Sequence, residues 1–316
     1  MTLLFPSTAR SAALASKYGY DEWLVSRFLQ YVPDVEAFFE KIEKPPTKYI
    51  RVNTLKTTRE ELVARLAAKG FELGDTAIHD VLAVKKAPLP TGATNEYLLG
   101  HYYIQDLSSC MAVEALDASE GQAVLDMAAA PGGKTTFIAQ KMKNTGSIIA
   151  LEPVEKRARS MAFNMERLGV SNTCVYKLDG LRATDLGSIF DRVLLDAPCS
   201  CEGIIAKDPA RKTSHLPDDV DYCSSRQEKM LKVAIQAAKP GGIVVYSTCS
   251  FAPEENEVVI DRAVKEFGVR VEPLAHGSEG MKTFGGANFD PSVRNSRRFY
   301  PHLHDTTGFF VARLRK

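Results

Sequence analysis

The sequence predicts an α/β protein whose larger part is a doubly wound, mostly parallel sheet with a smaller α+β module before it. From about residue 105 onward, short apolar segments alternate with helical segments, a pattern typical of parallel strands covered by helices. A glycine-bearing turn follows the first of these strands, and cysteine motifs follow two later ones. At 316 residues, with 45% hydrophobic and 25% charged residues, the chain is long enough for two globular domains. We predict domains at 1–104 and 105–316.

The first domain is expected to begin with short helices and to continue as a small strand–helix–strand segment that could serve as a substrate module. Apolar spacing and stop signals place its elements. The expected helices are Ser11–Tyr18, Asp21–Tyr31, one from Pro33 to before Pro45, and Thr58–Lys69; the expected strands are Tyr49–Asn53, Phe71–Leu73 and Val81–Val84.

The second domain is expected to hold repeated strand–helix units. The predicted strands are Ala123–Met127, Ser147–Leu151, Thr173–Leu178, Arg192–Asp196, Ile243–Ser247 and Gly308–Leu314; the predicted helices are 134–143, 154–168 and 224–238. A long connection without a predicted element, Ile204–Cys223, separates the fourth strand from the next helix. Connections of that length are uncommon in compact domains and are often functional.

Charge and hydropathy exclude some classes of protein. The net charge is only +1, so the whole chain carries no nucleic-acid signature. Residues 291–316, however, contain six basic residues against one acidic residue, together with aromatic and histidine side chains. Such a segment could contact phosphates, although a solvated charge run is the simpler alternative. No apolar run of 18 residues and no signal-peptide pattern is present, so we expect a cytoplasmic protein without a membrane span.

The six cysteines, at 110, 174, 199, 201, 223 and 249, have no regular spacing. Without an export signal they are expected to be thiols. Cys199-x-Cys201 with His302-x-His304 lacks the Cys-x₂-Cys spacing of structural zinc sites, so no metal is expected. Cys110 and Cys174 are expected in the core.

The expected cofactor site is the turn after the first strand. Asp126 ends this strand, and residues 128–135, Ala-Ala-Ala-Pro-Gly-Gly-Lys-Thr, lead into a helix. Small residues let a ligand approach the backbone, and the helix N-terminus offers free N–H groups to an anion. The turn is neither Gly-x-Gly-x-x-Gly nor a P-loop, which disfavours a nucleotide triphosphatase.

Acidic residues follow the next two strands. Glu152 lies about 20 residues beyond the glycines, where a carboxylate can accept from both ribose hydroxyls of a nucleotide. Asp179 follows the third strand, within reach of an adenine amino group, and Arg157 lies one helical turn beyond Glu152. Each carboxylate alone could equally be a helix cap or a surface charge.

Two cysteine motifs, Asp196-Ala-Pro-Cys199-Ser200 and Thr248-Cys249-Ser250, follow strand ends of the same predicted sheet. Because the carboxyl ends of parallel strands share one edge, the cysteines and the cofactor turn are expected to face one crevice. Thiolate-based covalent catalysis is the chemistry that this combination favours. A lone cysteine at a strand end is more often a small buried hydrophobe.

Five ordered motifs resemble the Fmu/Sun (NOL1/NOP2/Sun) family of RNA cytosine-5 methyltransferases. They are Arg51–Lys56, Asp126–Lys134, Asp196–Ser200, Thr248–Glu257 and Arg298–His304. The resemblance covers nearly the whole chain and is closest to compact archaeal members. It implies a Rossmann-like, S-adenosylmethionine-dependent methyltransferase sheet with a small N-terminal α+β RNA-binding module.

The resemblance also implies roles. Cys249 corresponds to the nucleophile that adds to cytosine carbon 6, and Cys199 to the second cysteine, which assists product release. Asp196 would contact the pyrimidine edge, and Lys134 would help to lower the thiol pKa. The residues implied for S-adenosylmethionine binding are Ala128, Ala129, Ala130, Pro131, Gly132, Gly133, Lys134, Glu152, Arg157, Asp179 and Asp196. By analogy with DNA cytosine-5 methyltransferases, Cys199 would attack instead.

The chain departs from the family pattern at two points. Cys201 stands where the family often has Gly, which could add a third thiol near the site, and Glu152 replaces the commoner Asp. Cys223 has no motif and receives no role.

The implied partner is RNA, with tRNA favoured and rRNA the alternative. The target base must leave any stack to meet both thiol and methyl donor. Arg51, Lys56 and the basic C-terminal stretch would supply the RNA surface. We expect a monomer. The rival interpretations are a non-catalytic RNA-binding or ribosome-assembly factor and a small-molecule methyltransferase.

Overall fold

The computed structural model describes residues 2–316, which form two compact units. Unit 1 comprises residues 2–46, 197–229 and 247–312; unit 2 comprises 47–196, 230–246 and 313–316. The chain leaves unit 2 at the end of strand β8, and strands β9 and β15 each have residues in both units. The predicted domain boundary after residue 104 stays a prediction.

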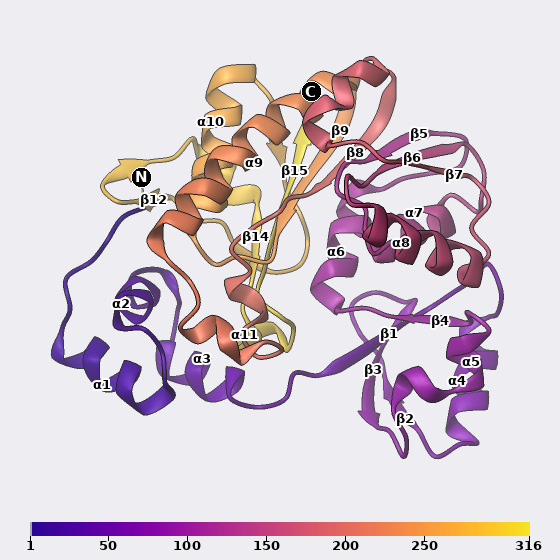
Figure 1. The fold of residues 1–316 in the computed structure, drawn as a ribbon, viewed down its shortest axis with the longest axis horizontal. Helices are drawn as coiled ribbons and strands as arrows, with labels where there is room; N and C mark the ends of the chain where they lie inside the picture. Colours follow the sequence, from indigo (N-terminus) through magenta and orange to yellow (C-terminus); the bar gives the residue numbers. More distant parts are fainter. Residues whose placement is uncertain (1) are drawn as a thin grey trace. The chain divides into compact units, whose positions relative to one another are not determined.

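Unit 2 contains the parallel sheet (Figure 1). Strands β5 (Ala123–Asp126), β6 (Ser147–Leu151), β7 (Thr173–Tyr176) and β8 (Phe190–Asp196) are parallel in the order β8-β5-β6-β7, with β9 (Ala238–Thr248) beside β8. Helices α7 (Gly133–Lys141) and α8 (Glu155–Leu168) lie side by side. The predicted α/β class, a Rossmann-like doubly wound sheet, is confirmed.

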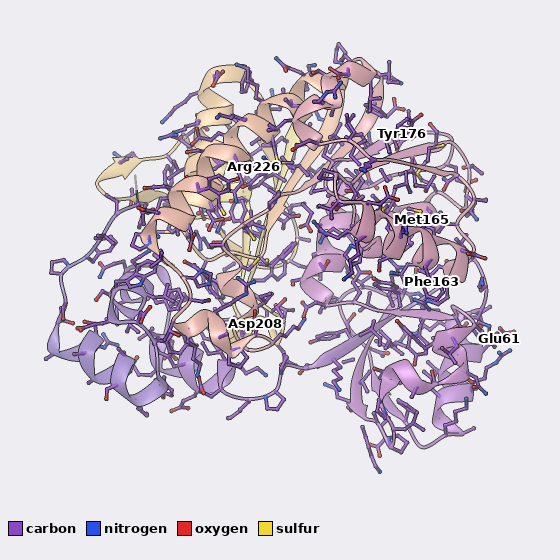
Figure 2. The ribbon with its side chains drawn as sticks, viewed as in Figure 1. Glu61, Phe163, Met165, Tyr176, Asp208 and Arg226 are labelled. Carbon is purple, nitrogen blue, oxygen red and sulfur yellow. The ribbon has the colours of Figure 1, made fainter. Side chains whose placement is uncertain are left out.

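The helix face of α8 shows why its position could be predicted. Met161 and Met165 are buried and pack against small alanines of the cofactor turn and β6, whereas Phe163 on the same helix is 64% exposed (Figure 2). One buried apolar face and one exposed face along the same helix are typical of an amphipathic surface helix. By contrast, α6 (Leu107–Leu116) is buried on nearly all sides, so its sequence has no polar face and it was not predicted.

The smaller sheet also belongs to unit 2. Strands β1 (Lys48–Val52), β2 (Glu72–Gly74), β3 (Val81–Lys86) and β4 (Tyr102–Ile104) are antiparallel in the order β2-β3-β1-β4. Helix α4 (Arg59–Ala67) packs its Leu62 and Leu66 on this sheet and is capped by Thr58 through a capping box with Glu61. The remaining helix is α5 (Asn95–Leu98). The predicted α+β module is confirmed as a fold.

Unit 1 begins with α1 (Ala9–Tyr18), α2 (Glu22–Tyr31) and α3 (Val35–Ile42). These helices build an aromatic core in which Phe251 packs edge-on against Phe28 and Phe38, at ring distances of 6.0 and 5.2 Å, and stacks on Tyr300 at 5.9 Å. Phe251 lies two residues beyond Cys249. The N-terminal helices therefore support the loop that carries this cysteine.

The other elements of unit 1 lie after residue 196. They are part of α9 (Pro217–Ala237), α10 (Glu257–Phe267), α11 (Pro301–His304), β10 (Arg270–Glu272), β11 (Ser278–Glu279), β12 (Thr283–Phe284), β13 (Ala287–Asn288), β14 (Arg297–Phe299) and part of β15 (Phe309–Arg315). Strand β14 pairs antiparallel with β11 and β15. The predicted structureless connection 204–223 is wrong in part, because it contains a 3₁₀ turn at Pro209–Lys212 and the first turns of α9. Across residues 2–316, no helix combines the length and apolarity needed to cross a bilayer.

Part of the basic C-terminal stretch is used inside the fold. In unit 1, Arg298 is 2% exposed and forms an ion pair with Glu257, and Phe299 and Tyr300 are buried. In unit 2, Arg313 donates to the Ala115 carbonyl at 2.7 Å. These two arginines are used inside the fold, whereas Arg294, Arg315 and Lys316 are exposed, so contact of the stretch with RNA stays a prediction.

Candidate active site

Unit 1 brings the two motif cysteines together. Cys199 follows β8 and Cys249 follows β9, and their Sγ atoms lie 3.2 Å apart. Cys201 adds a third thiol, 3.8 Å from Cys199 Sγ. All three side chains are partly buried, and none of the six cysteines in residues 2–316 forms a disulfide. The predicted thiol pair is therefore a cluster of three.

Cys201 occupies a backbone conformation that favours glycine, with φ +64° and ψ 30°. An L-residue in the left-handed region costs about 1 kcal/mol relative to glycine. The sequence comparison with the family had already indicated glycine here, and the structure gives the reason. The cysteine side chain that replaces it points its Sγ toward the Cys199 carbonyl, at 3.3 Å.

The three thiols influence one another's ionisation. Hydrogen bonds from Cys199 and Cys249 lower the pKa of Cys201, and the nearby Arg211 guanidinium acts in the same direction. Hydrogen bonds with Cys201 and Cys249, together with burial, raise the pKa of Cys199 well above its usual value. In such a coupled set the first proton leaves more easily than from an isolated thiol and the next leaves with more difficulty. The cluster therefore favours a single thiolate.

A buried carboxylate, Glu255, joins the two cysteine loops. Its Oε1 accepts from the hydroxyls of Ser200 (2.5 Å) and Ser250 (2.6 Å), each the residue after a motif cysteine. Its Oε2 accepts from the Ser200 N–H at 2.9 Å and from Gln227 Nε2 at 2.8 Å. Burial raises the pKa of Glu255. Glu255 lies within the motif Thr248–Glu257, but no role for it could be predicted from the sequence.

The neighbours of Glu255 fix the same loop. Asn256 accepts from the Thr248 hydroxyl at 2.6 Å and donates to the Ser250 carbonyl at 2.9 Å. Glu254 forms a buried ion pair with Arg27 at 2.7 Å, which ties the loop to α2. Glu254, Glu255 and Asn256 therefore anchor the loop that follows Cys249. The clustering of these polar residues in an otherwise apolar stretch was the sequence signal that could have indicated this role.

Unit 2 brings Lys134 and Asp196 together. Lys134 Nζ donates to Asp196 Oδ2 at 2.6 Å, and both side chains are largely covered. Asp196 ends β8, and Cys199 follows three residues later along the chain. The carboxylate is thus held as an ion pair just before the first cysteine. The predicted effect of Lys134 on a thiol stays a prediction.

The turn after β5 fits a nucleotide-type cofactor. Gly132 has φ +98°, and a Cβ there would meet Met161 at 3.1 Å. Asp126 is 1% exposed; one carboxylate oxygen accepts from Thr135 at 2.7 Å, and the other, Oδ1, has no hydrogen-bond partner among the described residues. Burial raises the pKa of Asp126 to about 6. An unsatisfied buried acceptor beside a helix N-terminus suits a ligand that brings a donor.

The other predicted cofactor residues lie at the ends of β6 and β7. Glu152 is buried, accepts from the Val154 N–H at 2.9 Å, and its second oxygen lies 3.3 Å from Arg157 Nη1. Arg157 also donates to the Ala130 carbonyl at 3.1 Å, which links it to the turn. Asp179 caps the next turn through the Leu181 N–H at 3.0 Å. Glu152 and Asp179 therefore follow the ends of two parallel strands, as predicted. Their contact with a cofactor stays a prediction.

Arg51 has a different role from the one predicted. It was expected to face RNA, but it is 1% exposed and donates to the Gly133 carbonyl at 2.8 Å and the Thr136 hydroxyl at 2.9 Å. Burial lowers the pKa of Arg51 to about 10. Its guanidinium therefore anchors the cofactor turn. Lys56 likewise donates to the Arg167 carbonyl at 2.7 Å, near the C-terminus of α8.

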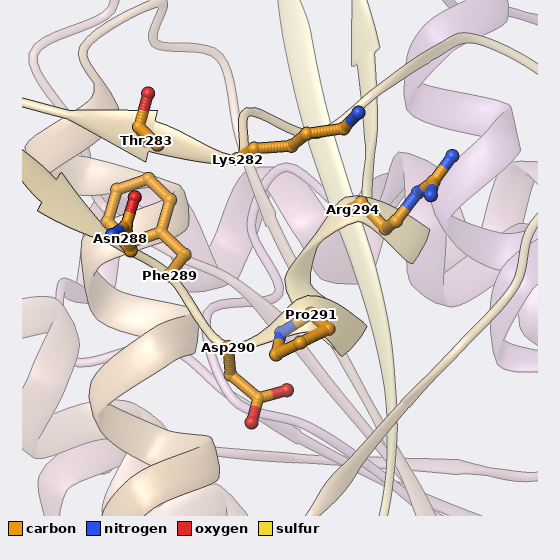
Figure 3. A pocket seen from close by; sticks show the side chains of 7 residues that line it. All are labelled: Lys282, Thr283, Asn288, Phe289, Asp290, Pro291 and Arg294. Carbon is orange, nitrogen blue, oxygen red and sulfur yellow. The ribbon is translucent and has the colours of Figure 1, made fainter.

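A separate hollow of about 430 Å³ lies in unit 1 (Figure 3). Its lining residues are Lys282, Thr283, Asn288, Phe289, Asp290, Pro291 and Arg294. None of the predicted site residues belongs to it, and its Arg294 is ion-paired with Glu279 at 2.9 Å. The hollow is therefore no argument for the chemistry of the thiols.

Comparison with known families gives two matches that together span most of the chain. Residues 113–315 match the family described as 16S rRNA methyltransferase RsmB/F. Residues 20–88 match the ferredoxin-like domain of RsmF/B-like methyltransferases.

Individual relatives agree with these matches. A mouse protein named 28S rRNA (cytosine-C(5))-methyltransferase is 44% identical over 96% of the chain, and Aliivibrio salmonicida ribosomal RNA small subunit methyltransferase F is 38% identical over 89%. The chain spans 40% and 60% of their respective lengths.

Solved structures agree as well. A methyltransferase homologue from Pyrococcus horikoshii has a TM-score of 0.90 at 38% identity, with 98% of this chain and 99% of that one covered. NSun6 from the same organism, solved with SFG, has a TM-score of 0.80 at 28% identity, with 90% and 94% covered.

Proposed function

The chain belongs to the RsmB/F methyltransferase family, and from that premise we propose that it methylates carbon 5 of a cytosine in RNA by covalent catalysis. The observation that carries the proposal is the pair of motif thiols with Sγ atoms 3.2 Å apart. A structural core cysteine needs no such partner. Two thiols at one substrate position allow one to bond to the base and the other to assist its release.

We assign the attack on cytosine carbon 6 to Cys249. A carbon–sulfur bond at carbon 6 pushes electron density onto carbon 5, which is otherwise a poor nucleophile. The thiolate is the form of a cysteine that attacks. Glu255 holds the loop of this cysteine against the loop of Cys199, so the sulfur is oriented before substrate arrives.

Asp196 is the group proposed to hold the pyrimidine edge. As a carboxylate ion-paired with Lys134, it accepts a hydrogen bond from the exocyclic amine of cytosine. After methylation a base removes the carbon 5 proton, the carbon–sulfur bond breaks, and electrons return to the thiol. We assign assistance in this last step to Cys199.

We propose S-adenosylmethionine as the cofactor, which supplies an electrophilic methyl group when bound. The turn at 128–134 would approach its methionine part, with the α7 N-terminus facing the carboxylate. Glu152 would take the ribose hydroxyls, Asp179 would meet the adenine amino group, and Arg157 would close over the ribose side. The unsatisfied Asp126 Oδ1 and the SFG-bound relative support this placement.

For the RNA class we propose ribosomal RNA. The sequence analysis favoured tRNA, but the names of the mouse and Aliivibrio relatives refer to ribosomal RNA, and nothing in the comparisons supports the tRNA preference. We further propose a cytoplasmic monomer, which light scattering and cell fractionation would test.

The test is nucleoside mass spectrometry on unmodified rRNA and tRNA incubated with S-adenosylmethionine and protein. Wild type is compared with Cys249→Ala and with the control Cys174→Ala. Cys174 lies on β7 in unit 2 with an exposed side chain, so its predicted place in the core is wrong. We expect 5-methylcytidine in rRNA with wild type and Cys174→Ala only. Product on tRNA alone would reverse the RNA assignment. No product on either RNA would favour the non-catalytic RNA-binding or assembly factor.

A further inference from the structure

The thiol cluster contains one more sulfur than the proposed methyl transfer uses. Cys199 and Cys249 account for attack and release, whereas Cys201 has no part in either step. Its Sγ nevertheless lies 3.8 Å from Cys199 Sγ, and the three sulfurs all lie within 4.8 Å of one another. This chain places Cys201 there in a left-handed conformation that glycine would adopt more easily.

We propose that Cys199, Cys201 and Cys249 form a binding site for a soft divalent cation such as Zn²⁺, whose occupancy blocks the nucleophile. The proposal concerns an inhibitory site rather than a resident cofactor. Thiolates are the ligands that zinc and other thiophilic ions prefer. Its inhibitory part rests on the proposed function, while the binding itself does not.

The distances fit a three-sulfur site. With Zn–S bonds of about 2.3 Å, sulfurs around one ion stand about 3.8 to 4.0 Å apart. The Cys199–Cys201 pair already has this separation at 3.8 Å, and the Cys199–Cys249 pair, at 3.2 Å, has to open slightly. A χ1 rotation of one cysteine supplies that change without moving the backbone. Cys201, which stands where the family often has glycine, therefore supplies the third sulfur that the metal site needs.

The surroundings favour the charge of such a complex. Binding replaces the thiol protons by the cation, Zn²⁺ + 3 RSH giving [Zn(SR)₃]⁻ and three protons, so the product is an anion. Arg211 donates to the Ser200 carbonyl at 3.1 Å and interacts electrostatically with Cys201. His215 also interacts with Cys201, is 4% exposed, and its Nε2 has no hydrogen-bond partner among the described residues. A guanidinium and an imidazole thus lie close enough to Cys201 to interact with it electrostatically.

The positioning network limits how the site can respond. Glu255 holds Ser200 and Ser250, the residues that follow two of the three ligands. The Gly203 N–H donates to the Cys249 carbonyl at 2.8 Å, which links the loop of Cys249 to the segment that follows Cys201. Since the backbone is held from both sides, ligands that must lie close together are preorganised, which reduces the ordering cost of binding.

The test uses the full-length protein under a non-thiol reductant. Cd²⁺ is titrated while the thiolate-to-metal absorption is followed, and Zn²⁺ affinity is measured by competition with a chromophoric chelator. The variants are Cys201→Gly, which relaxes the backbone, and Cys201→Ser, which keeps the volume but replaces sulfur by oxygen. Cys223→Ala is the control, because Cys223 lies in the same unit outside the cluster.

We expect wild type and Cys223→Ala to bind one ion per chain. Both Cys201 variants should bind at least about tenfold more weakly, because removing a metal ligand costs more affinity than removing a group that only hydrogen-bonds to a ligand. Zn²⁺ should inhibit wild-type methyl transfer reversibly and inhibit Cys201→Gly much less, each measured as a fraction of that protein's own metal-free rate. Equal affinity in the Cys201 variants, or no binding to wild type, would overturn the proposal. Metal binding without methyl transfer by any variant would leave the site standing and reject the proposed function instead.

Discussion

The substitution Glu255→Ala should destabilise unit 1 and separate the two cysteine loops. The change removes the acceptor of four hydrogen bonds, from Ser200 N–H, the Ser200 and Ser250 hydroxyls, and Gln227 Nε2. The hydroxyls retain each other at 3.1 Å, but the Ser200 N–H loses its acceptor in a buried place. Gln227 Nε2 keeps only the Pro198 carbonyl, at 2.8 Å.

The size of the effect follows from those contacts. Each buried donor left unsatisfied costs about 1–3 kcal/mol, and hydrogen bonds to a charged group lie at the upper end. We expect a loss of about 4 kcal/mol in the free energy of unfolding, which for a chain of this size lowers Tm by about 6 °C. A displacement of the sulfurs by about 1 Å would reduce kcat about a hundredfold.

Differential scanning calorimetry and methyl-transfer kinetics check this prediction. Gln227→Ala is the graded control, because it leaves three donors on Glu255 and should cost about 1 kcal/mol. A Glu255→Ala protein with wild-type Tm and kcat would refute the idea that this carboxylate positions the thiols. A lowered Tm with unchanged kcat would restrict it to a structural role.

Three further predictions concern other residues. Burial raises the pKa of Glu202 to about 8 from a usual 4.5, so between these values the folded state holds a proton that the unfolded state lacks. Stability should therefore fall as pH rises through this window, by up to about 1.4 kcal/mol per pH unit, and Glu202→Gln should flatten that fall in urea titrations at several pH values. Arg51→Met should weaken S-adenosylmethionine binding about tenfold by calorimetry, because the Gly133 carbonyl loses a charged donor; exposed Lys86→Met serves as control, and equal affinities would contradict the anchoring role. Gly203→Ala should lower Tm, because its Cβ would come 2.3 Å from the Gly308 carbonyl oxygen, whereas Gly92→Ala, with nothing nearer than 4.0 Å, should not.

The sequence predicted the helices and strands whose apolar residues recur at a regular spacing or whose ends carry glycine, proline or capping residues. The strand Ser147–Leu151 was placed to the residue, and α8 within one residue, because apolar runs and the amphipathic face mark them. Helix α6 was missed because it is buried nearly all round. The start of α9 was missed because Pro217 begins it inside a polar segment that was interpreted as a loop.

For the site, residue identity was easier to predict than residue role. The motif thiols do meet, and Lys134 does meet Asp196. The basic motif residues Arg51 and Arg298 were assigned to RNA, yet both are buried and bonded within the fold. A charged residue is written identically in a sequence whether it faces solvent or anchors a turn, so only the tertiary contacts distinguish the two. The same limit hid Glu255, whose four donors come from segments up to 55 residues away in the chain.

The division of labour between the two cysteines is the central claim, and peptide mapping of a trapped adduct tests it most directly. Cys199→Ala protein is incubated with substrate RNA and S-adenosylmethionine, digested with nuclease and protease, and analysed by mass spectrometry. A methylated cytidine attached to the peptide that contains Cys249 is the predicted result. An adduct that forms instead in Cys249→Ala protein, on the peptide containing Cys199, would contradict the assignment.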